Sequence, residues 1–230
     1  MLTLALDTAT KVCTAALCRD RHILAEYTVN AGMTHSEGLL PQLEQLFSSA
    51  RIARRELDLV AVSMGPGSFT GLRIGLATAE AIAYSLNICL HGVNTLEALA
   101  YNLPVEGIML SPVLDAQKGN YYQALYLWEK GRLRTVAEAR VVSAAAVLER
   151  IALQGTKALL LGECARLARA GLPEWAQAAP EALRLPRASS VAFAAADAFD
   201  PLADKRIFGL EPYYIRRSEA EELWERKQKA

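Results

Sequence analysis

Residues 60–76 read VAVSMGPGSFTGLRIGL, an apolar run that ends in a glycine-rich turn and continues directly into a helix of small residues. A buried strand, a glycine turn and a helix in succession are typical of α/β proteins. Glycines at such a turn let a ligand or another stretch of backbone approach closely. The turn is therefore the first place in the chain where we expect function.

On either side of this stretch, segments with the apolar pattern of strands alternate with segments that have the apolar spacing of helices. Apolar runs predict strands over residues 2–6, 12–18, 22–29, 59–63 and 88–93. Apolar or small residues at helical spacing predict helices over residues 36–47, 70–86 and 95–101, with Ser36 as a cap of the first. This order of elements implies a mixed sheet with helices packed on it.

A weak copy of the N-terminal segment appears 108 residues later. Residues 2–7 read LTLALD, residues 110–115 read LSPVLD, and an Ala-Leu pair follows each segment at the same distance. The repeat predicts a duplicated fold, with a first domain over residues 1–103 and a second over residues 104–230. Further strands are expected over 121–128, 133–141 and 158–161, and helices over 143–153 and 189–199, the latter capped by Ser189. The charged end from Ser218 onward reads as a solvated helix or a frayed tail.

Composition narrows the class of protein. The chain has 230 residues, of which 52% are hydrophobic, so it can bury a substantial core. Its 25 basic residues balance 25 acidic ones, so no charge excess indicates nucleic-acid binding by the chain alone. Without a long apolar run, no membrane contact is expected. Because the four cysteines form no CxxC pair, we expect reduced, half-buried thiols and a cytoplasmic protein.

The glycine turn admits two interpretations. Gly65 and Gly67 resemble a phosphate-cradling loop at a helix N-terminus, with Asp7 and Asp115 flanking a Mg–nucleotide between the duplicated domains. The candidate nucleotide-binding residues are then Asp7, Thr8, Thr10, Gly65, Gly67 and Asp115. However, the turn lacks the lysine of a P-loop, and Thr70 stands where a dinucleotide fingerprint needs glycine. The other interpretation is a turn whose glycines serve strained backbone and close packing.

The small residues of the following helix also leave two alternatives open. Gly71 and Gly75, with the alanines after them, allow another backbone to approach, either the helix's own sheet or a helix of another subunit. Other chemistry finds little support. Ser68 is not in a GxSxG elbow, and the histidines His22, His35 and His91 lack the spacing of metal ligands or catalytic partners. We expect no metal and no cofactor.

Four segments together resemble the TsaB (YeaZ) family: LALDTAT at residues 4–10, HSEGLLPQLEQLF at 35–47, the stretch at 60–76, and GVNTLEALA at 92–100. Two later segments are looser matches. LDAQKGNYYQALY at 114–126 has Gln117 where the family usually has Arg, and EPYYIRR at 211–217 resembles its C-terminal signature.

The resemblance implies a fold and an absence of catalysis. Members of the family have the actin-like, Hsp70-like ATPase (ASKHA) fold, made of two ribonuclease-H-like domains of which the second is reduced. Their catalytic paralogue, TsaD, holds a metal with two histidines in a motif similar to residues 94–99, where this chain has Thr95 and Leu99. Neither side chain replaces an imidazole. The resemblance thus implies a chain that is not itself an enzyme.

What the resemblance implies instead is a scaffold. The family pairs with TsaD through the helices of its first domain, and a TsaE-like ATPase joins the pair. The complex transfers threonylcarbamoyl from threonylcarbamoyl-AMP to the adenosine 3′ of the anticodon in ANN-reading tRNAs, so tRNA is expected as a partner only through the complex. The expected interface residues are His35, Leu39, Leu40, Leu43, Phe47, Gly71, Arg73 and Leu76. Alone, the same surface is expected to form a homodimer, and Leu43→Glu to block pairing without unfolding the chain.

Two other functions are weighed against this one. An ATP-binding enzyme of the actin-like and sugar-kinase superfold is suggested by Asp7, Thr8, Thr10 and the glycine turn. A glycoprotease-like hydrolase is suggested only by activities once attached to relatives of the family, and the chain lacks both metal ligands and a nucleophile elbow.

Overall fold

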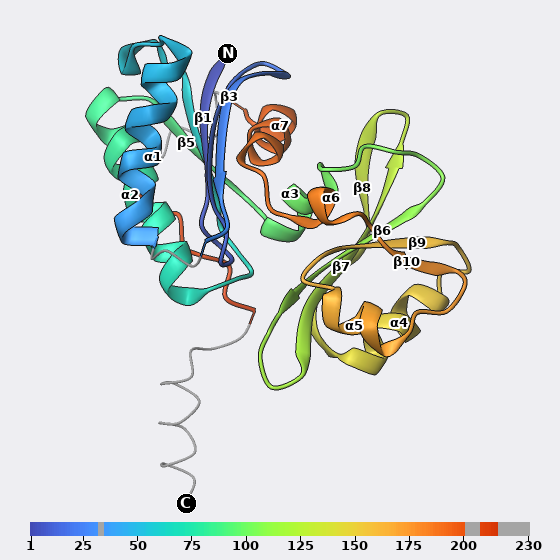
Figure 1. Cartoon of the computed structure of the whole chain (residues 1–230). Helices are drawn as coiled ribbons and strands as arrows, with labels where there is room; N and C mark the ends of the chain where they lie inside the picture. Colours follow the sequence, from blue (N-terminus) through green and yellow to red (C-terminus); the bar gives the residue numbers. More distant parts are fainter. Residues whose placement is uncertain (32–34, 201–207, 216–230) are drawn as a thin grey trace, which may run out of the picture.

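The computed structural model describes residues 1–31, 35–200 and 208–215. Within these ranges the chain forms two α/β domains, each built on a mixed sheet of five strands (Figure 1). None of the described helices is both long and apolar enough to cross a membrane.

The first sheet has the strand order β3-β2-β1-β4-β5. Its strands are β1 (Leu2–Asp7), β2 (Cys13–Arg19), β3 (His22–Val29), β4 (Leu59–Ser63) and β5 (Cys89–Val93). The first three strands form the predicted antiparallel meander, and β4 and β5 run parallel to β1.

The second sheet has the order β10-β9-β6-β7-β8. Its strands are β6 (Met109–Asp115), β7 (Asn120–Glu129), β8 (Arg132–Ser143), β9 (Ala158–Gly162) and β10 (Ala176–Ala178). Strands β6, β7 and β8 are antiparallel, while β9 and β10 run parallel to β6. Strand for strand this repeats the first sheet, with β6 in the place of β1. The predicted duplication and the actin-like fold class are therefore confirmed.

Helices differ in length between the two halves. The first half has α1 (His35–Ala50), the single turn η1 (Arg54–Glu56), α2 (Phe69–Leu86) and α3 (Thr95–Ala100). The second has α4 (Ala144–Ala152), α5 (Ala165–Ala170), α6 (Glu181–Arg184) and α7 (Ala188–Ala198). The 18 residues of α2 correspond to only 6 in α5, so the second domain is reduced, as expected.

Two predicted helix caps are wrong. Ser36 lies inside α1, which already begins at His35. Ser189 lies inside α7, where its hydroxyl donates to Glu26 Oε1 on β3 instead of capping the helix. In the described ranges, the N-cap residues whose own side chains accept from a backbone N–H of the first turn are Ser68 for α2, Asn94 for α3 and Ser143 for α4.

Both faces of the first sheet are covered. Along β1, Leu4 and Leu6 point toward α1 and α2, while Ala5 points toward α7, because successive side chains alternate between faces of a strand. Figure 1 shows α1 and α2 on one side of this sheet and α7 on the other. Helix α7 comes late in the sequence yet packs on the first sheet. The predicted assignment of residues 104–230 to the second domain therefore needs correction at residues 188–198.

A shared core joins the two domains. Leu110 and Tyr126 of the second sheet belong to the same buried cluster as Leu59 of the first sheet and Val191 of α7. Trp128 donates its indole N–H to the carbonyl oxygen of Ala100 on α3 at 3.2 Å. The far face of the second sheet has its own cluster, covered by α4 and α5.

The last described residues return to the first domain. The N–H of Tyr213 donates to the carbonyl oxygen of Met64, at the end of β4, at 2.6 Å. Phe208 packs against Tyr84 of α2 with 5.3 Å between ring centroids, and Leu210 packs on the first domain's core. The predicted terminal helix or tail from Ser218 onward lies outside the described residues.

Candidate functional site

The turn between β1 and β2 lies directly beneath the glycine turn that precedes α2. The N–H of Ser68 donates to the carbonyl oxygen of Ala9 at 2.7 Å, and the Thr8 hydroxyl donates to the carbonyl oxygen of Gly71 at 2.7 Å. A Cβ at Gly67 would lie 2.3 Å from the Ala9 oxygen, and one at Gly71 would lie 2.0 Å from the Thr8 oxygen. Only glycine fits at these positions, because the neighbouring atoms belong to the backbone. Close packing, one of the two interpretations of the glycines, is therefore present at Gly67 and Gly71.

Asp7 is sealed inside this packing. Only 1% of the residue is exposed, and its Oδ2 accepts from the Ser63 hydroxyl at 2.5 Å while its Oδ1 accepts from the N–H of Ala9 at 2.9 Å. Burial raises the pKa of Asp7, and the two hydrogen bonds oppose the increase without cancelling it. Among the predicted nucleotide-binding residues, Asp7 and Thr8 are thus enclosed by their own domain rather than directed at a cleft.

The equivalent turn of the second half is open. Asp115 ends β6 as Asp7 ends β1, and its Oδ1 accepts from the N–H of Gln117 at 2.7 Å, which is the same local hydrogen bond. Asp115 is exposed. Its backbone N–H donates to Glu163 Oε2 at 2.7 Å, and the pKa of Glu163 is raised mainly by desolvation.

A cleft of about 470 Å³ separates the two turns. It is bordered by Thr10 and Gly67 from the first domain, by Asp115 from the second, and by Tyr213 and Tyr214 from the C-terminal segment. The structure therefore brings three of the predicted nucleotide-binding residues to one cleft. Gly65 is not at the cleft, because it is buried beneath the backbone oxygen of Tyr213.

The predicted interface residues of α1 differ in burial. Leu39, Leu43 and Phe47 are buried in their own domain, with exposed fractions of 1%, 5% and 8%. Leu40 lies at the edge of this face, three residues before Leu43, and is 60% exposed. The idea that Leu43→Glu leaves the chain folded needs correction, because the carboxylate would enter the domain's own core. Leu40 is the large apolar residue that this helix exposes to another protein.

Helix α2 separates its small residues in the same way. Gly71, Gly75 and Leu76 are buried toward the sheet. Ala77 and Ala81 lie on the exposed face, in one stripe with Arg73 and Tyr84. The first alternative for the small residues, packing on the helix's own sheet, therefore holds for Gly71 and Gly75, and the exposed alanines remain available to a second helix.

At the start of α2, Arg73 forms an aromatic cluster that sequence reasoning missed. Its guanidinium lies 3.9 Å from the ring centroid of Phe69, and its Nε–H donates to the Tyr214 hydroxyl at 3.2 Å. Phe69 and Tyr214 stack with centroids 4.9 Å apart. The partner comes from a segment 141 residues away, so no local pattern could have revealed the cluster.

His35 begins α1 and contacts the first turn. Its Nε2 lies 2.7 Å from the carbonyl oxygen of Thr10, and its buried Nδ1 has no hydrogen-bond partner among the described residues. The ring therefore fastens α1 to the β1–β2 turn. This placement agrees with a structural role at the start of the helix better than with a ligand role.

Thr95 and Leu99, where the resemblance implies the metal ligands of the catalytic paralogue, are part of the core. Thr95 is fully buried, and its hydroxyl oxygen accepts from the N–H of Gly65 at 3.1 Å. Leu99 is 1% exposed and belongs to the cluster shared by the two domains. Among the described residues, no group of three His, Cys, Asp or Glu side chains is placed to hold a metal ion.

The cysteine thiols are packed inside the protein. Cys13, Cys18 and Cys164 are buried, and Cys89 is partly buried. Burial raises the pKa of Cys13 to about 11 and that of Cys18 to about 12, so both are protonated at neutral pH.

Comparison with known proteins gives consistent matches over most of the chain. Residues 29–224 match the family model described as TsaD, tRNA N6-adenosine threonylcarbamoyltransferase. The chain is 33% identical over 233 aligned positions to the tRNA threonylcarbamoyladenosine biosynthesis protein TsaB of Bacillus subtilis, with 100% of both chains covered. It is 30% identical over 128 positions to TsaB of Escherichia coli, covering 55% of each. The solved structure of YeaZ from Pseudomonas aeruginosa superposes with a TM-score of 0.73 at 26% identity, covering 86% of this chain and 91% of that one.

Proposed function

Because this chain belongs to the TsaB (YeaZ) family, we propose that it is a non-catalytic subunit in the biosynthesis of threonylcarbamoyladenosine in tRNA. Its role is to dock on and activate a TsaD-like catalytic paralogue. The observation that carries the proposal is the outer surface of α1 and α2, where Leu40 and Tyr84 are 60% and 65% exposed although both are large and apolar.

The proposed interface is a helical bundle. Helices α1 and α2 lie side by side on one face of the first sheet (Figure 1), and their buried faces are already used by the domain's own core. Ala77 and Ala81 give the exposed face of α2 little bulk, so a partner helix can approach closely between Arg73 and Tyr84. An apolar centre with a charged rim is the usual anatomy of a protein interface. Of the residues expected at the interface, Leu40 and Arg73 are the ones that we now propose as contacts.

The absence of catalysis is proposed on the chemistry of the side chains. Thr95 and Leu99 occupy the positions of the paralogue's histidines, and leucine has no donor atom with which to bind a metal. Asp7 is enclosed by the glycine turn, with both carboxylate oxygens already accepting hydrogen bonds. This arrangement favours a scaffold over an ATP-using enzyme.

The subunit works within a larger complex. The TsaD-like partner transfers threonylcarbamoyl from threonylcarbamoyl-AMP to the adenosine 3′ of the anticodon in ANN-reading tRNAs, and a TsaE-like ATPase joins the pair. In the absence of TsaD, the exposed faces of α1 and α2 pair with those of a second copy. All of these steps belong to the cytoplasm.

The experiment is co-purification of tagged chain with an untagged TsaD-like partner. Leu40→Glu is expected to keep the unfolding midpoint of the wild type and to lose the partner, because burying an unpaired carboxylate in an interface costs about 3 kcal/mol or more. Leu153→Glu is the matched control, since Leu153 is 83% exposed at the end of α4 in the other domain.

Each outcome bears on a different part of the proposal. Co-elution of Leu40→Glu at wild-type stoichiometry would remove α1 from the interface. Threonylcarbamoyl transfer to tRNA by the purified chain, with no partner added, would remove the claim that the subunit is non-catalytic.

A further inference from the structure

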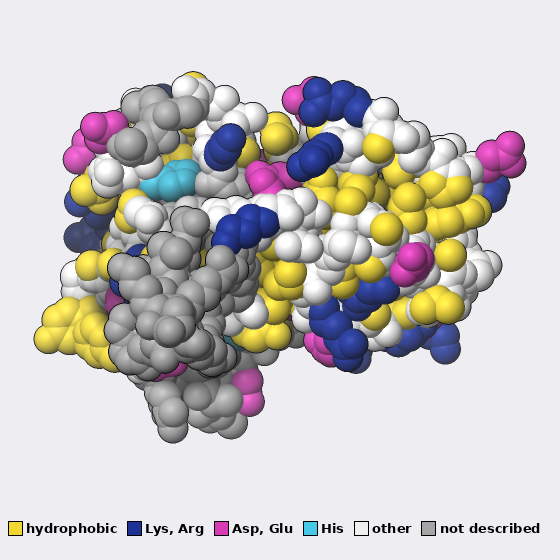
Figure 2. Space-filling model, turned by 90° about the horizontal axis from the view of Figure 1, so that it is seen from below, with side chains coloured by type: hydrophobic (Ala, Val, Ile, Leu, Met, Phe, Trp, Pro, Cys, Tyr) yellow, Lys and Arg dark blue, Asp and Glu magenta, His cyan; other side chains and the backbone are white. Residues whose placement is uncertain are grey.

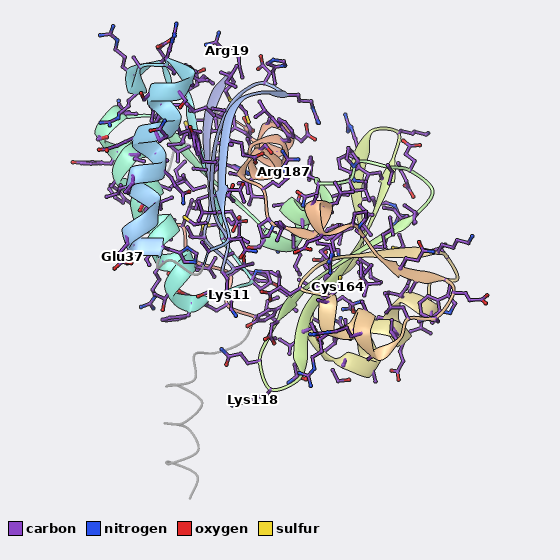
Figure 3. All side chains as sticks on the ribbon, in the orientation of Figure 1. Lys11, Arg19, Glu37, Lys118, Cys164 and Arg187 are labelled. Carbon is purple, nitrogen blue, oxygen red and sulfur yellow. The ribbon has the colours of Figure 1, made fainter. Side chains whose placement is uncertain are left out.

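A second cavity, of about 400 Å³, gathers cationic side chains from three separate elements. Lys11 comes from the β1–β2 turn, Arg166 and Arg169 come from α5, and Arg184 ends α6. The two arginines of α5 are three residues apart and therefore lie on the same side of the helix. Figure 3 labels Lys11 in the first domain and Cys164, the residue before α5, in the second.

Most N–H donors of these cations have no hydrogen-bond acceptor among the described residues. Among the described residues, Lys11, Arg166 and Arg169 make no hydrogen bond or ion pair. The Nε–H of Arg184 is buried and has no hydrogen-bond partner among the described residues. The Nη1 of Arg184 donates only to the Cys164 sulfur, at 3.7 Å. The unpartnered cations of Lys11, Arg166 and Arg169 line the cavity, so its wall is suited to an acceptor that comes from outside the chain.

Three carboxylates, Asp115, Glu163 and Glu181, also line the cavity, but among the described residues none of them forms an ion pair or hydrogen bond with the arginines. Asp115 accepts from the N–H of Gln117, and Glu163 accepts from the N–H of Asp115. Both are therefore engaged by the β6–β7 turn. Figure 2 shows Lys and Arg side chains on both lobes beside the boundary between them, with Asp and Glu side chains among them.

We propose that this cavity binds a phosphate group. Guanidinium and ammonium groups that approach from α5, α6 and the β1–β2 turn match a tetrahedral anion, whose oxygens point in several directions, better than a planar carboxylate, which one arginine fork satisfies. The phosphate belongs either to a small free compound or to the backbone of an RNA. The site lies on the second domain and on Lys11, apart from the outer faces of α1 and α2, so it does not depend on the docking function.

The test measures binding of two probes to the full chain: inorganic pyrophosphate by calorimetry, and an unmodified tRNA transcript by filter binding. The variant is the double substitution Arg166→Ala and Arg169→Ala. Its control is the double substitution Lys130→Ala and Arg132→Ala, which removes the same charge from exposed positions at the β7–β8 turn of the same domain. All four residues are exposed, so unfolding midpoints should match the wild type.

We expect the α5 variant to bind pyrophosphate at least about tenfold more weakly than the wild type, and the control to be unchanged. If tRNA binding falls with the same variant and pyrophosphate competes for it, the phosphate comes from RNA, and the salt dependence should flatten by about one phosphate contact per arginine. If tRNA binding is unaffected, the ligand is a small phosphate compound.

The proposal is overturned if the wild type binds neither probe saturably, if the α5 variant binds as well as the wild type, or if both double variants lose binding equally. Leu40→Glu serves as an independent reference. It should retain pyrophosphate binding, so failure of the docking function and failure of the phosphate site are distinguishable.

Discussion

The turns that follow β1 and β6 start from the same local structure and end in different surroundings. In both, an aspartate at the end of the strand accepts a backbone N–H two residues later, as Asp7 does from Ala9 and Asp115 does from Gln117. In the first half, the glycines of the next strand–helix junction let α2 close over the turn. In the second half, the corresponding junction leads to the short helix α5, and Asp115 stays exposed. The first turn is thus covered by α2, whereas its duplicate faces a cleft.

The largest expected effect comes from forcing the closed turn apart. Gly71→Ala should lower the free energy of unfolding by about 3 kcal/mol, because the new methyl group would meet the backbone oxygen of Thr8. Gly119→Ala is the matched change in the open turn, where nothing lies near the new Cβ and the positive φ alone should cost about 1 kcal/mol. Urea titration measures both values. Equal losses would mean that the two turns are packed alike.

A somewhat smaller effect should separate the buried Leu43 of α1 from the exposed Leu40. Leu43→Ala should destabilise the chain by about 2 kcal/mol, because Leu43 fills the core of the first domain. Leu40→Ala should change stability by less than about 0.5 kcal/mol, because its side chain is mostly in water. Thermal and urea unfolding of the two variants in parallel are sufficient. A large loss at Leu40 would place it inside the core and undo its proposed role.

The sealed carboxyl should also give the closed turn its own pH dependence. Since burial raises the pKa of Asp7 in the folded state above its ordinary value of 3.8, folding favours the protonated form. Stability from this group is present below the ordinary pKa and is lost as the pH rises through the folded-state pKa. Relative to the wild type, Asp7→Asn should therefore become progressively more stable as the pH rises above about 4.

Urea titrations at several pH values measure this difference. Asp115→Asn removes the same formal charge from the open turn and serves as the control. A difference between the wild type and Asp7→Asn that stays constant with pH would show that Asp7 is not titrating in a sealed environment.

The smallest expected signal is the heat released when Mg–ATP is added to the isolated chain. With Asp7 and Thr8 enclosed beneath α2, we expect no nucleotide binding that depends on Asp7, so any heat should be the same in Asp7→Asn. Calorimetry tests this directly. Tight binding that disappears in Asp7→Asn would mean that the turn opens to nucleotides, and the ATP-using alternative would then replace the scaffold.

Most of the fold could be predicted from the sequence because its signals are local. Strands such as β4 are continuous apolar runs, and the repeat of LTLALD at LSPVLD indicates the duplication through the order of residues alone. The packing of α7 on the first sheet could not be predicted in this way. An alanine-rich helix fits either sheet, and only the three-dimensional path of the chain decides which one it covers.

The candidate site was predicted less completely, for the same reason. The glycines indicated a tight turn, but which backbone they admit depends on Thr8 and Ala9, about 60 residues earlier. The apolar stripe of α1 was identified, yet periodicity cannot tell a leucine that faces the chain's own sheet from one that faces a partner. Arg166 and Arg184 carried no signal at all, since their meeting depends on two short helices separated by proline-rich loops.

The position of α7 constrains the order in which the domains can fold during synthesis on the ribosome. Strands β1, β2 and β4 are synthesised early, but the face that carries Ala5 and Ala61 stays uncovered until residues 188–198 have been translated. The first domain therefore cannot finish folding before the second has emerged. A nascent chain arrested after residue 103 would present a bare apolar sheet to chaperones, and a gene truncated there should yield an aggregating product rather than half of a working subunit.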